Sequence, residues 1–495
     1  MHIGVDVGTS STKSCAFDEH GLLVAEANYA YDFSNLSEGK REIDPASFQT
    51  AVIETLKSVS QQLKEGHRPL PRSITISSLG EAVVPLDTDG IPLHPFISGT
   101  DIRGEKESHC LGTQVGFEAV AAITGVAVGG LFSVGKMMWI QQHLPHVYEK
   151  ADKWLNVQDY VVYLLSGHMV MDESIASRTM LYDYIQHEWS QTLLDISGFA
   201  KRQLPDVVRS GTAVGCILPH IAAMTGLPSD TRIVVGSHDH IANALGCGVL
   251  KPGWACNPTG TTEGITAIMN ERISPEHIAK FNISCEPFAI SGLYCTVAWH
   301  NAAGALIKWY MREIAHHADG GLDGLNEKCP SHPTRLLILP HFSGGATPDF
   351  DSGSKGAVIG MTLSTTHYDI FKALMEGTCF ELRKIMNTMT ECGLSIHHLV
   401  MCGGGAHSPV WRQLKSDILD RPISLPSRQQ TGALGCSIMG AVACGDYFDI
   451  PHAVTSMTDI QPAAQPIEQH VIEYASLMQA YQTLYPLLAP IHHVL

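Results

Sequence analysis

A strand that runs into a loop of small polar residues and resumes as a second strand occurs twice in this chain. The first copy, IGVDVGTSSTKSCAFD, starts at Ile3, and the second, WACNPTGTTEGITAIM, starts at Trp254. A Walker loop and a dinucleotide-binding loop both open a helix, so neither template fits. Loops of this composition expose backbone N–H groups and hydroxyls with little side-chain bulk, which phosphate oxygens require. The repeated pattern therefore favours phosphate binding.

The first loop, over residues 8–13, carries a cation and follows a carboxylate. Lys13 at its end can add a point charge for a phosphate. Asp6, on the strand before the loop, is placed to face Mg2+, which binds a few carboxylates and keeps several waters. Taken alone, the loop is equally compatible with a plain tight hairpin. The second loop, at 260–262, and a glycine cluster at 403–405 favour the phosphate interpretation.

Length and charge limit the class of protein. The 495 residues predict two domains, because a single core stops growing at about 250–300 residues. A formal charge of −17 without any basic run excludes nucleic acids and anionic membranes as partners. The thirteen cysteines show no C-x-x-C pair and no zinc-type spacing with histidine, so they predict small core residues of a reduced protein. No signal peptide is expected at the start, and we expect a cytoplasmic location.

Strand and helix patterns alternate along the chain, which predicts an α/β fold. Strands are expected at 2–7, 14–17, 22–27 and 73–80, and after a polar loop at 236–239 a helix is expected to start near residue 240. Helical periodicity appears at 45–63, within 117–166, at 368–392 and in the last forty or so residues. The segment 336–361, rich in Gly, Ser and Pro, predicts a long surface crossing.

Four motifs together resemble one known family. GVDVGTSSTK, GSHDHIANALGCG, PTGTT and CGGGAHSPVWRQLKSDIL occur in the order and approximate spacing of the FGGY carbohydrate kinases, and the chain is most similar to their xylulose kinase branch. The resemblance implies two actin-like, RNase H-type ATPase domains with a deep cleft between them. It also implies domain limits of 1–246 for sugar and the first phosphate loop, 247–455 for the nucleotide, and 456–495 for a helical extension.

The resemblance assigns roles on the nucleotide side. Asp239 matches the residue that acts as base on the attacking sugar hydroxyl, and with Asp6 it would hold Mg2+. At a helix start, Asp239 should be kept ionised by the helix dipole, although a plain N-cap is the alternative. The residues implied to contact ATP are Gly8, Thr9, Ser10, Ser11, Lys13, Gly260, Thr261, Gly304, Gly404, Gly405 and Ala406.

The sugar side departs from the family pattern. The W-x-D-x-R segment of the family is here Gly99-Thr100-Asp101-Ile102-Arg103, and its usual glutamine after the ISSLG strand is Glu81. The resemblance implies sugar contacts from Glu81, Asp101, Arg103 and Asp239, in a pocket that is wider and more polar than that of a xylulose kinase. Asp101 and Arg103 are also compatible with a surface ion pair.

The predicted activity is ATP-dependent phosphorylation of a terminal hydroxyl of a ketose or polyol, with Mg2+ neutralising the triphosphate. Two other classes stay open: an actin-like nucleotide-dependent assembly protein, and a non-catalytic sugar or nucleotide sensor on the same fold.

Gln430, where the family commonly has glutamate, puts a structural hydrogen bond in question. Trp299, His300 and Asn301 either close the cleft or are core and solvated residues. A homodimer is the working expectation for assembly.

Overall fold

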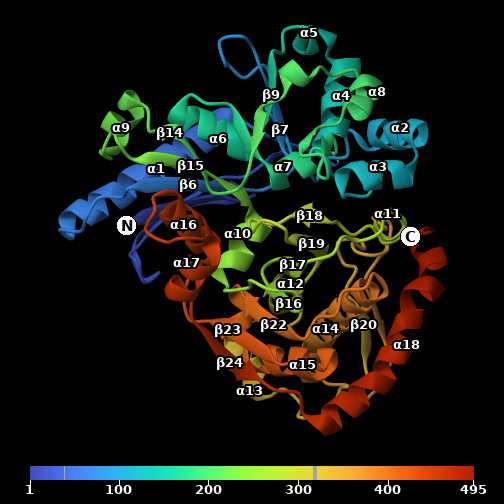
Figure 1. The fold of residues 1–495 in the computed structure, drawn as a ribbon. Coiled ribbons are helices and arrows are strands. Elements are labelled where there is room, and N and C mark those ends of the chain that lie inside the picture. Colours follow the sequence, from blue (N-terminus) through green and yellow to red (C-terminus); the bar gives the residue numbers. More distant parts are fainter. Residues whose placement is uncertain (38, 316–319) are drawn as a thin grey trace.

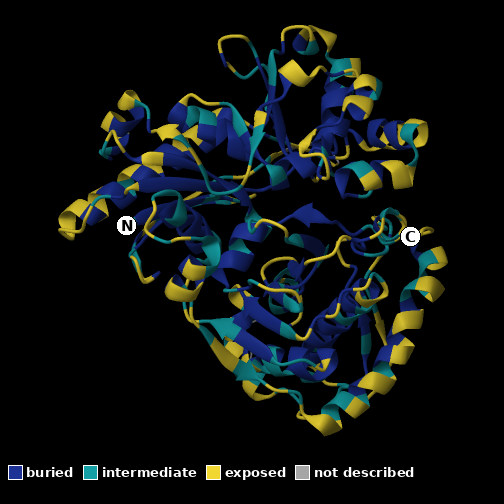
Figure 2. Cartoon of the chain, in the orientation of Figure 1, coloured by how far each residue is buried: buried dark blue, intermediate teal, exposed yellow. Residues whose placement is uncertain are grey.

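The computed structural model describes residues 1–37, 39–315 and 320–495. Within these ranges the chain forms two lobes, each built on its own β-sheet (Figure 1). The blue and green part of the chain makes the first lobe, and the yellow and orange part makes the second. Buried residues form the sheets and the layer between the lobes, whereas exposed residues lie on the outer helices and loops (Figure 2).

The first lobe has a six-stranded sheet in the order β14-β15-β6-β1-β2-β3. A hairpin meander opens it, because β1 pairs antiparallel with β2, and β2 with β3, whereas β6 and β15 join in parallel. The strands are β1 (His2–Val7), β2 (Ser11–Phe17), β3 (Leu23–Ala30), β6 (Ser73–Ser78), β14 (Thr212–Cys216) and β15 (Arg232–His238).

Helices from distant parts of the sequence cover this sheet. One face is covered by α1 (Pro45–Glu65) and α6 (Val157–Ser166), and the other by α16 (Thr431–Ala443), which returns from the end of the chain. The return requires a close approach, since a β-carbon at Gly4 would lie 1.8 Å from the carbonyl oxygen of Ala433. Glycine is therefore required where α16 crosses β1.

A smaller sheet, in the order β4-β5-β8-β7-β9, and several helices complete the first lobe. Its strands are β4 (Ser34–Ser37), β5 (Lys40–Ile43), β7 (Val83–Leu86), β8 (Phe96–Ile97) and β9 (Lys153–Asn156). The helices are α2 (Glu105–Val115), α3 (Phe117–Thr124), α4 (Ser133–His143), α5 (Pro145–Tyr148), α7 (Glu173–Ser177), α8 (Gln191–Ser197) and α9 (Pro219–Thr225). Short strands β10 (Val170–Asp172) and β13 (Asp206–Val208) pair, as do β11 (Tyr182–Asp183) and β12 (Glu188–Trp189).

The second lobe repeats the plan with a seven-stranded sheet, β18-β19-β17-β16-β22-β23-β24. Its strands are β16 (Trp254–Pro258), β17 (Glu263–Met269), β18 (Glu286–Pro287), β19 (Tyr294–His300), β22 (His398–Cys402), β23 (Ile423–Pro426) and β24 (Ile460–Ala464). Around the sheet lie α10 (Asp239–Gly246), α12 (Gly304–Glu313), α13 (Gly321–Glu327), α14 (His367–Glu391), α15 (Pro409–Leu419) and α17 (Ile450–Met457). Helices α10 and α16 pack on each other between the two sheets.

The C-terminal helix α18 (Glu468–His492) runs along the outside of the second lobe, in red in Figure 1. It packs on α14 and α15 and is fixed by buried tyrosines. Tyr474 donates to Glu376 over 2.7 Å, and Tyr481 donates to Glu381 over 2.5 Å. The segment predicted as an extension also contains β24, which adds a strand to the second sheet.

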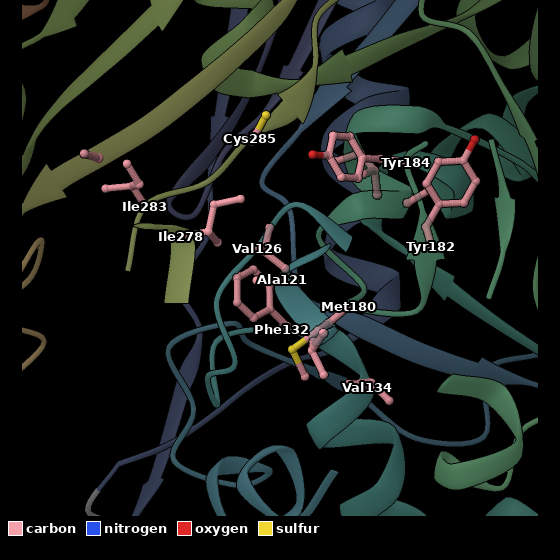
Figure 3. Packing of buried hydrophobic residues seen from close by; sticks show 14 of the residues in the cluster. Ala121, Val126, Phe132, Val134, Met180, Tyr182, Tyr184, Ile278, Ile283 and Cys285 are labelled. Atoms are coloured by element: carbon pink, nitrogen blue, oxygen red, sulfur yellow. The ribbon is translucent and has the colours of Figure 1, made fainter. Parts of the chain in front are cut away.

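An apolar cluster joins the two lobes at one end. Val126 and Phe132 of the first lobe belong to the same cluster as Ile278 and Ile283 of the second, and Figure 3 shows these residues gathered together. Helix α11 (Pro275–Phe281) packs on α3, and Cys285 N–H donates to the carbonyl of Gly125 over 2.7 Å. The lobes are therefore in direct contact in this conformation.

Several local expectations need correction. Strand β2 begins at Ser11, so the first loop spans only residues 8–10 and Lys13 lies on the strand. Strand β15 continues through His238, where a loop was expected, because these polar residues are buried and paired in the sheet. The segment 336–361 is not a surface crossing throughout, since Thr347 and Ser354 are fully buried. Among the described helices, none is both long and apolar enough to cross a membrane.

Candidate functional site

A cavity of about 340 Å³ lies where the two lobes meet α10 and α16. Both hairpins contribute to it, through Asp6 and Lys13 of the first and Pro258 at the end of β16 in the second. Asp239 enters from the start of α10, and Thr431 from the start of α16. The structure thus brings two carboxylates, a lysine and two helix N-termini to one cavity.

Both aspartates have pKa values above the ordinary value of 3.8. Burial, and next the nearby carboxylate of Asp239, raise the pKa of Asp6 to about 6. Burial, and next the carboxylate of Glu81, raise the pKa of Asp239 to about 7. The expectation that the helix dipole keeps Asp239 fully ionised is therefore wrong for the metal-free protein, because desolvation and carboxylate repulsion outweigh the dipole.

Lys13 and two histidines surround these carboxylates. Lys13 stands opposite Asp6 on the paired strand, and its Nζ donates to Oε1 of Gln430 over 3.3 Å. Gln430 thus forms a hydrogen bond with Lys13 as a glutamine. Nε2 of His238 lies 3.3 Å from Oδ1 of Asp239, and Nε2 of His240 lies 3.8 Å from the same oxygen. Two neighbouring imidazoles, with ring centroids 5.1 Å apart, therefore lie near one oxygen of the aspartate.

The glycine-rich segments of the second lobe meet at one place. Gly304 N–H donates to the carbonyl of Gly260 over 2.9 Å, and Gly405 N–H donates to that of Thr259 over 3.0 Å. The second loop, the start of α12 and the segment after β22 are thereby joined. A β-carbon at Gly404 would meet no atom within 4 Å, so this backbone is open to a ligand.

A buried lysine forms hydrogen bonds to residues at the base of the second loop. Lys415 on α15 is fully buried, and its Nζ donates to Thr259 Oγ1 over 2.5 Å, to Asn257 Oδ1 over 2.6 Å and to Glu263. Glu263 also accepts from His300 over 2.8 Å. Burial alone would raise the pKa of Glu263, but Lys415 and then His300 hold it at about 2. The loop thus rests on an ionised, satisfied network, and His300 is neither solvated nor in the cleft.

A buried arginine links the lobes beside the predicted sugar residues. Oε1 of Glu81 accepts from Nε of Arg178 over 2.5 Å and also from its Nη2. Nη1 of the same arginine donates to Glu286 of the second lobe over 2.9 Å. Oε2 of Glu81 lies beside Gly99, where a β-carbon would come within 3.0 Å of it. The two departures from the family pattern therefore contact each other.

A second cavity, also of about 340 Å³, opens next to this arginine. Arg178 and Phe132 line it from the first lobe, and Trp299, Asn301 and Phe350 line it from the second. Trp299 is therefore a cleft residue, as one of the two interpretations predicted. The cavity has aromatic and polar walls, which suits a small polyhydroxylated ligand.

Asp101 and Arg103 form a buried pair rather than a surface one. Arg103 binds Asp101 through both Nε and Nη2, at 2.9 and 2.6 Å, and its Nη1 donates to Glu42 over 2.6 Å. The backbone N–H of Arg41 donates to Asp101 over 2.6 Å. Both side chains are thus engaged within the first lobe, and neither lines the two cavities described above.

The comparison with family models decides the identity of this site. The N-terminal domain model of the FGGY family of carbohydrate kinases matches residues 1–246, and its C-terminal domain model matches residues 257–444. The chain belongs to the FGGY family of carbohydrate kinases. It is therefore an ATP-dependent sugar kinase, and neither the assembly protein nor the sensor is supported.

Individual FGGY relatives agree over almost the whole chain. The xylulose kinase of Bacillus subtilis is 27% identical over 485 residues, covering 98% of this chain and 96% of that protein. The gluconokinase of the same organism is also 27% identical, over 501 residues, with the same two coverages. The solved xylulose kinase of Rhodospirillum rubrum matches with a TM-score of 0.89 at 26% identity, covering 99% of each chain. The predicted two-lobed, actin-like α/β fold is confirmed.

The FGGY site also contains residues that its sequence motifs did not point to. They are Arg178, Glu286, His240, Asn243, Thr431 and Lys415. Arg178 and Glu286 stand in segments without any motif, and only the packing of the lobes pairs them. Lys415 lies inside a quoted motif, and its position on α15, four residues after the apolar Trp411, could have indicated burial.

Proposed function

We propose that this kinase transfers the γ-phosphoryl group of ATP to a terminal hydroxyl of a neutral ketose or polyol. One observation carries the proposal: the carboxylates of Asp6 and Asp239 share a cavity with Lys13 and Gly403, and the Glu81–Arg178 pair lies near enough to act on the charge of Asp239. Phosphoryl transfer needs positioning and charge neutralisation more than covalent chemistry. Such a cavity supplies cations and carboxylates for both.

Asp239 acts as the base in this proposal. A carboxylate with a pKa of about 7 accepts a proton efficiently near neutral pH, and a third of its side chain is exposed to the cleft. The hydroxyl proton of the sugar passes to Asp239 as the oxygen attacks the γ-phosphorus, and ADP leaves with the bridging oxygen. Nε2 of His238 and Nε2 of His240 lie 3.3 and 3.8 Å from the buried Oδ1, which has no hydrogen-bond partner among the described residues.

The residues present suit Mg2+ and ATP. Asp6 and Asp239 provide the hard oxygen donors that this ion prefers, and burial, followed by a nearby carboxylate, raises the pKa of each, so that a cation there would be favoured. When bound, Mg2+ would neutralise the triphosphate. The backbone of residues 8–10, 260–261 and 404–406 would contact the nucleotide, with Lys13 adding positive charge, as the predicted ATP residues imply.

The charge of the acceptor side favours a neutral sugar over a sugar acid. Glu81 and Glu286 share the guanidinium of Arg178, and the buried Lys136 and the cavity-lining Glu105 stand beside them, so this group carries one net negative charge when all five are ionised. An aldonate would be repelled there, whereas the hydroxyls of a ketose or polyol can donate to Glu81 Oε2. The two Bacillus subtilis relatives are a xylulose kinase and a gluconokinase, one enzyme of each kind, so charge is the discriminating feature. Asp101 and Arg103 would support Glu81 and its neighbours from within the first lobe.

An ADP-release screen tests the proposal. Pentuloses, hexuloses, polyols and sugar acids are each supplied with MgATP, and a sample without sugar measures background hydrolysis. We expect release above background with a ketose or polyol and none with an aldonate. Release only with sugar acids would overturn the neutral-acceptor assignment, and sugar binding without ADP release would overturn the transfer itself.

A cytoplasmic location and a homodimer are part of the proposal. ATP and reduced thiols are characteristic of the cytoplasm, and all thirteen cysteines are free in the structure. Light scattering after size exclusion measures the assembly directly.

A further inference from the structure

We propose that Cys247, Cys256 and Cys402 form a zinc site. It lies beside the cavity lined by Asp6, Lys13 and Asp239, called the phosphate cavity below. One ligand atom from each cysteine lies within 4.8 Å of the other two. Cys247 and Cys256 are fully buried, and Cys402 is 6% exposed. The three residues are far apart in sequence and have no zinc-type spacing, so only the fold assembles them.

Each cysteine comes from an element that positions the phosphate cavity. Cys247 ends α10, the helix that begins with Asp239. Cys256 lies on β16, which leads to the second phosphate loop, and Cys402 ends β22 immediately before Gly403. A metal held by all three would therefore join the interlobe helix to the two strands that support the nucleotide segments.

A disulfide does not account for the arrangement of the two strand cysteines. In the parallel register Cys256 stands opposite Val400, so Cys402 is two residues further along the neighbouring strand. Strand spacing of ~4.8 Å and a rise of ~3.3 Å per residue separate such α-carbons by ~8 Å. A disulfide needs less than about 7 Å. A separation of two residues nevertheless places both thiols on the same face of the sheet, where they can share a ligand.

Three thiolates leave one position of a tetrahedral zinc for an oxygen ligand such as water. Oδ1 of Asn243 does not fill it in this orientation, because it lies 3.9 Å from the sulfur of Cys402 and accepts from Oγ1 of Thr431 over 2.5 Å. Sulfurs at ~2.3 Å from a tetrahedral zinc are ~3.8 Å apart, so the cluster would contract by about 1 Å or less.

Hydrogen-bond donors and a helix start face the sulfur of Cys402, which the phosphate cavity also reaches. Nδ2 of Asn243 donates to the sulfur of Cys402 over 3.4 Å and to that of Cys256 over 3.6 Å. Helix α16 begins at Thr431, and its N-terminal dipole favours negative charge there. Asn243, Cys402 and Thr431 also line the phosphate cavity, so an ion can reach the sulfurs from it.

Metal titration of the full-length, reduced protein tests the site. After dialysis against a chelator, Zn2+ is added in competition with a chromophoric chelator, and Co2+ is added separately as a spectroscopic probe. We expect one tight Zn2+ per chain and a near-ultraviolet sulfur-to-cobalt charge-transfer band. The band separates this site from the His238–Asp239–His240 group, whose nitrogen and oxygen atoms cannot produce it.

Variants identify the ligands. Cys402→Ser and Cys256→Ala should each remove the band and weaken tight Zn2+ binding by more than the ~10–100-fold that loss of an outer hydrogen bond costs. Cys295→Ala is the matched control, because Cys295 is fully buried in the same apolar cluster yet outside the sulfur group, and it should keep both signals. Circular dichroism melting checks that each variant folds, with Cys247→Ser in reserve. Absence of the band in the wild type, or its persistence in Cys402→Ser, overturns the proposal.

Discussion

Oε2 of Glu81 fills the space beside Gly99, such that a β-carbon at residue 99 would lie 3.0 Å from that oxygen. Contacts this short require the neighbour to move, and Glu81 cannot move freely because Arg178 holds its other oxygen. The aromatic side chain expected from the family pattern at residue 99 has no room while Glu81 keeps this position. The carboxylate and the glycine therefore act as one unit on the acceptor side.

The first prediction tests this coupling. Gly99→Ala should lower kcat/KM for the best sugar by several-fold up to the ~10²-fold that a 1 Å misplacement costs, with KM for ATP unchanged. Glu81→Ala should also lower kcat/KM, but the double variant should have a kcat/KM close to that of Glu81→Ala alone. The double-mutant cycle, measured by steady-state kinetics, should give a coupling free energy of ~0.5–3 kcal/mol. Strictly additive effects would show that the two residues act independently.

The second prediction concerns Asp239. Asp239→Asn keeps the shape of the side chain but cannot accept the hydroxyl proton, so transfer should fall by ~10²–10⁴-fold. ATP binding, measured by calorimetry, should stay close to that of the wild type. Asp195→Asn, an exposed change on α8, is the control and should leave both unchanged. A variant that keeps more than about a tenth of the rate in the coupled ADP assay contradicts the assigned role.

The third prediction follows from the raised pKa of the same carboxyl. Its pKa of about 7 in the folded protein exceeds the ordinary value of 3.8, so between these values the folded state binds more protons than the unfolded state. Stability of the metal-free protein should therefore fall as pH rises through this window. Relative to wild type, the Tm of Asp239→Asn should increase from pH 4 to pH 7 and then level off.

Mg2+ gives the complementary test of the same prediction. If Asp6 and Asp239 hold Mg2+ as proposed, the ion binds their ionised carboxylates, so its stabilising effect should be larger above their pKa values of about 6 and about 7 than below them. Scanning calorimetry with and without Mg2+ across that range measures it. An effect of equal size on both sides, or one that survives in Asp239→Asn, places the ion elsewhere.

Much of this architecture could be predicted because local patterns and tertiary structure agree there. The two hairpins are visible as strand, small-polar loop, strand, and the structure pairs Asp6 with Lys13 as a hairpin requires. The sequence did not predict the end of β15 because Ser237 and His238 are polar residues that are buried in this strand. The backbone N–H of His238 donates a hydrogen bond to Oγ of Ser174 over 2.9 Å. Polarity predicts exposure only when no buried partner exists.

The remaining features of the fold and the site could not be predicted, because they depend on residues that are far apart in the sequence. Arg178 meets Glu81 and Glu286 across sequence separations of 97 and 108 residues, which no local pattern encodes. The cysteine group depends on the register of β16 against β22, and spacing rules for zinc motifs do not detect it. The segment 336–361 has loop composition, yet Thr347 N–H donates to the carbonyl of Trp299 over 3.1 Å inside the cleft.

The last prediction concerns the lysine below the second phosphate loop. Lys415→Met removes the buried ammonium that pairs with Glu263 and binds Thr259, leaving an uncompensated carboxylate in the core. Breaking such a pair typically costs ~3–5 kcal/mol of unfolding free energy, measured by urea titration. Lys106→Met, an exposed change on α2, should cost little. Adding Glu263→Gln to Lys415→Met should recover part of the loss, because the unpaired charge is then gone.

KM for ATP should rise in Lys415→Met, since the loop at 259–262 loses its support. A loss below about 1 kcal/mol would mean that water or His300 compensates Glu263 without the lysine.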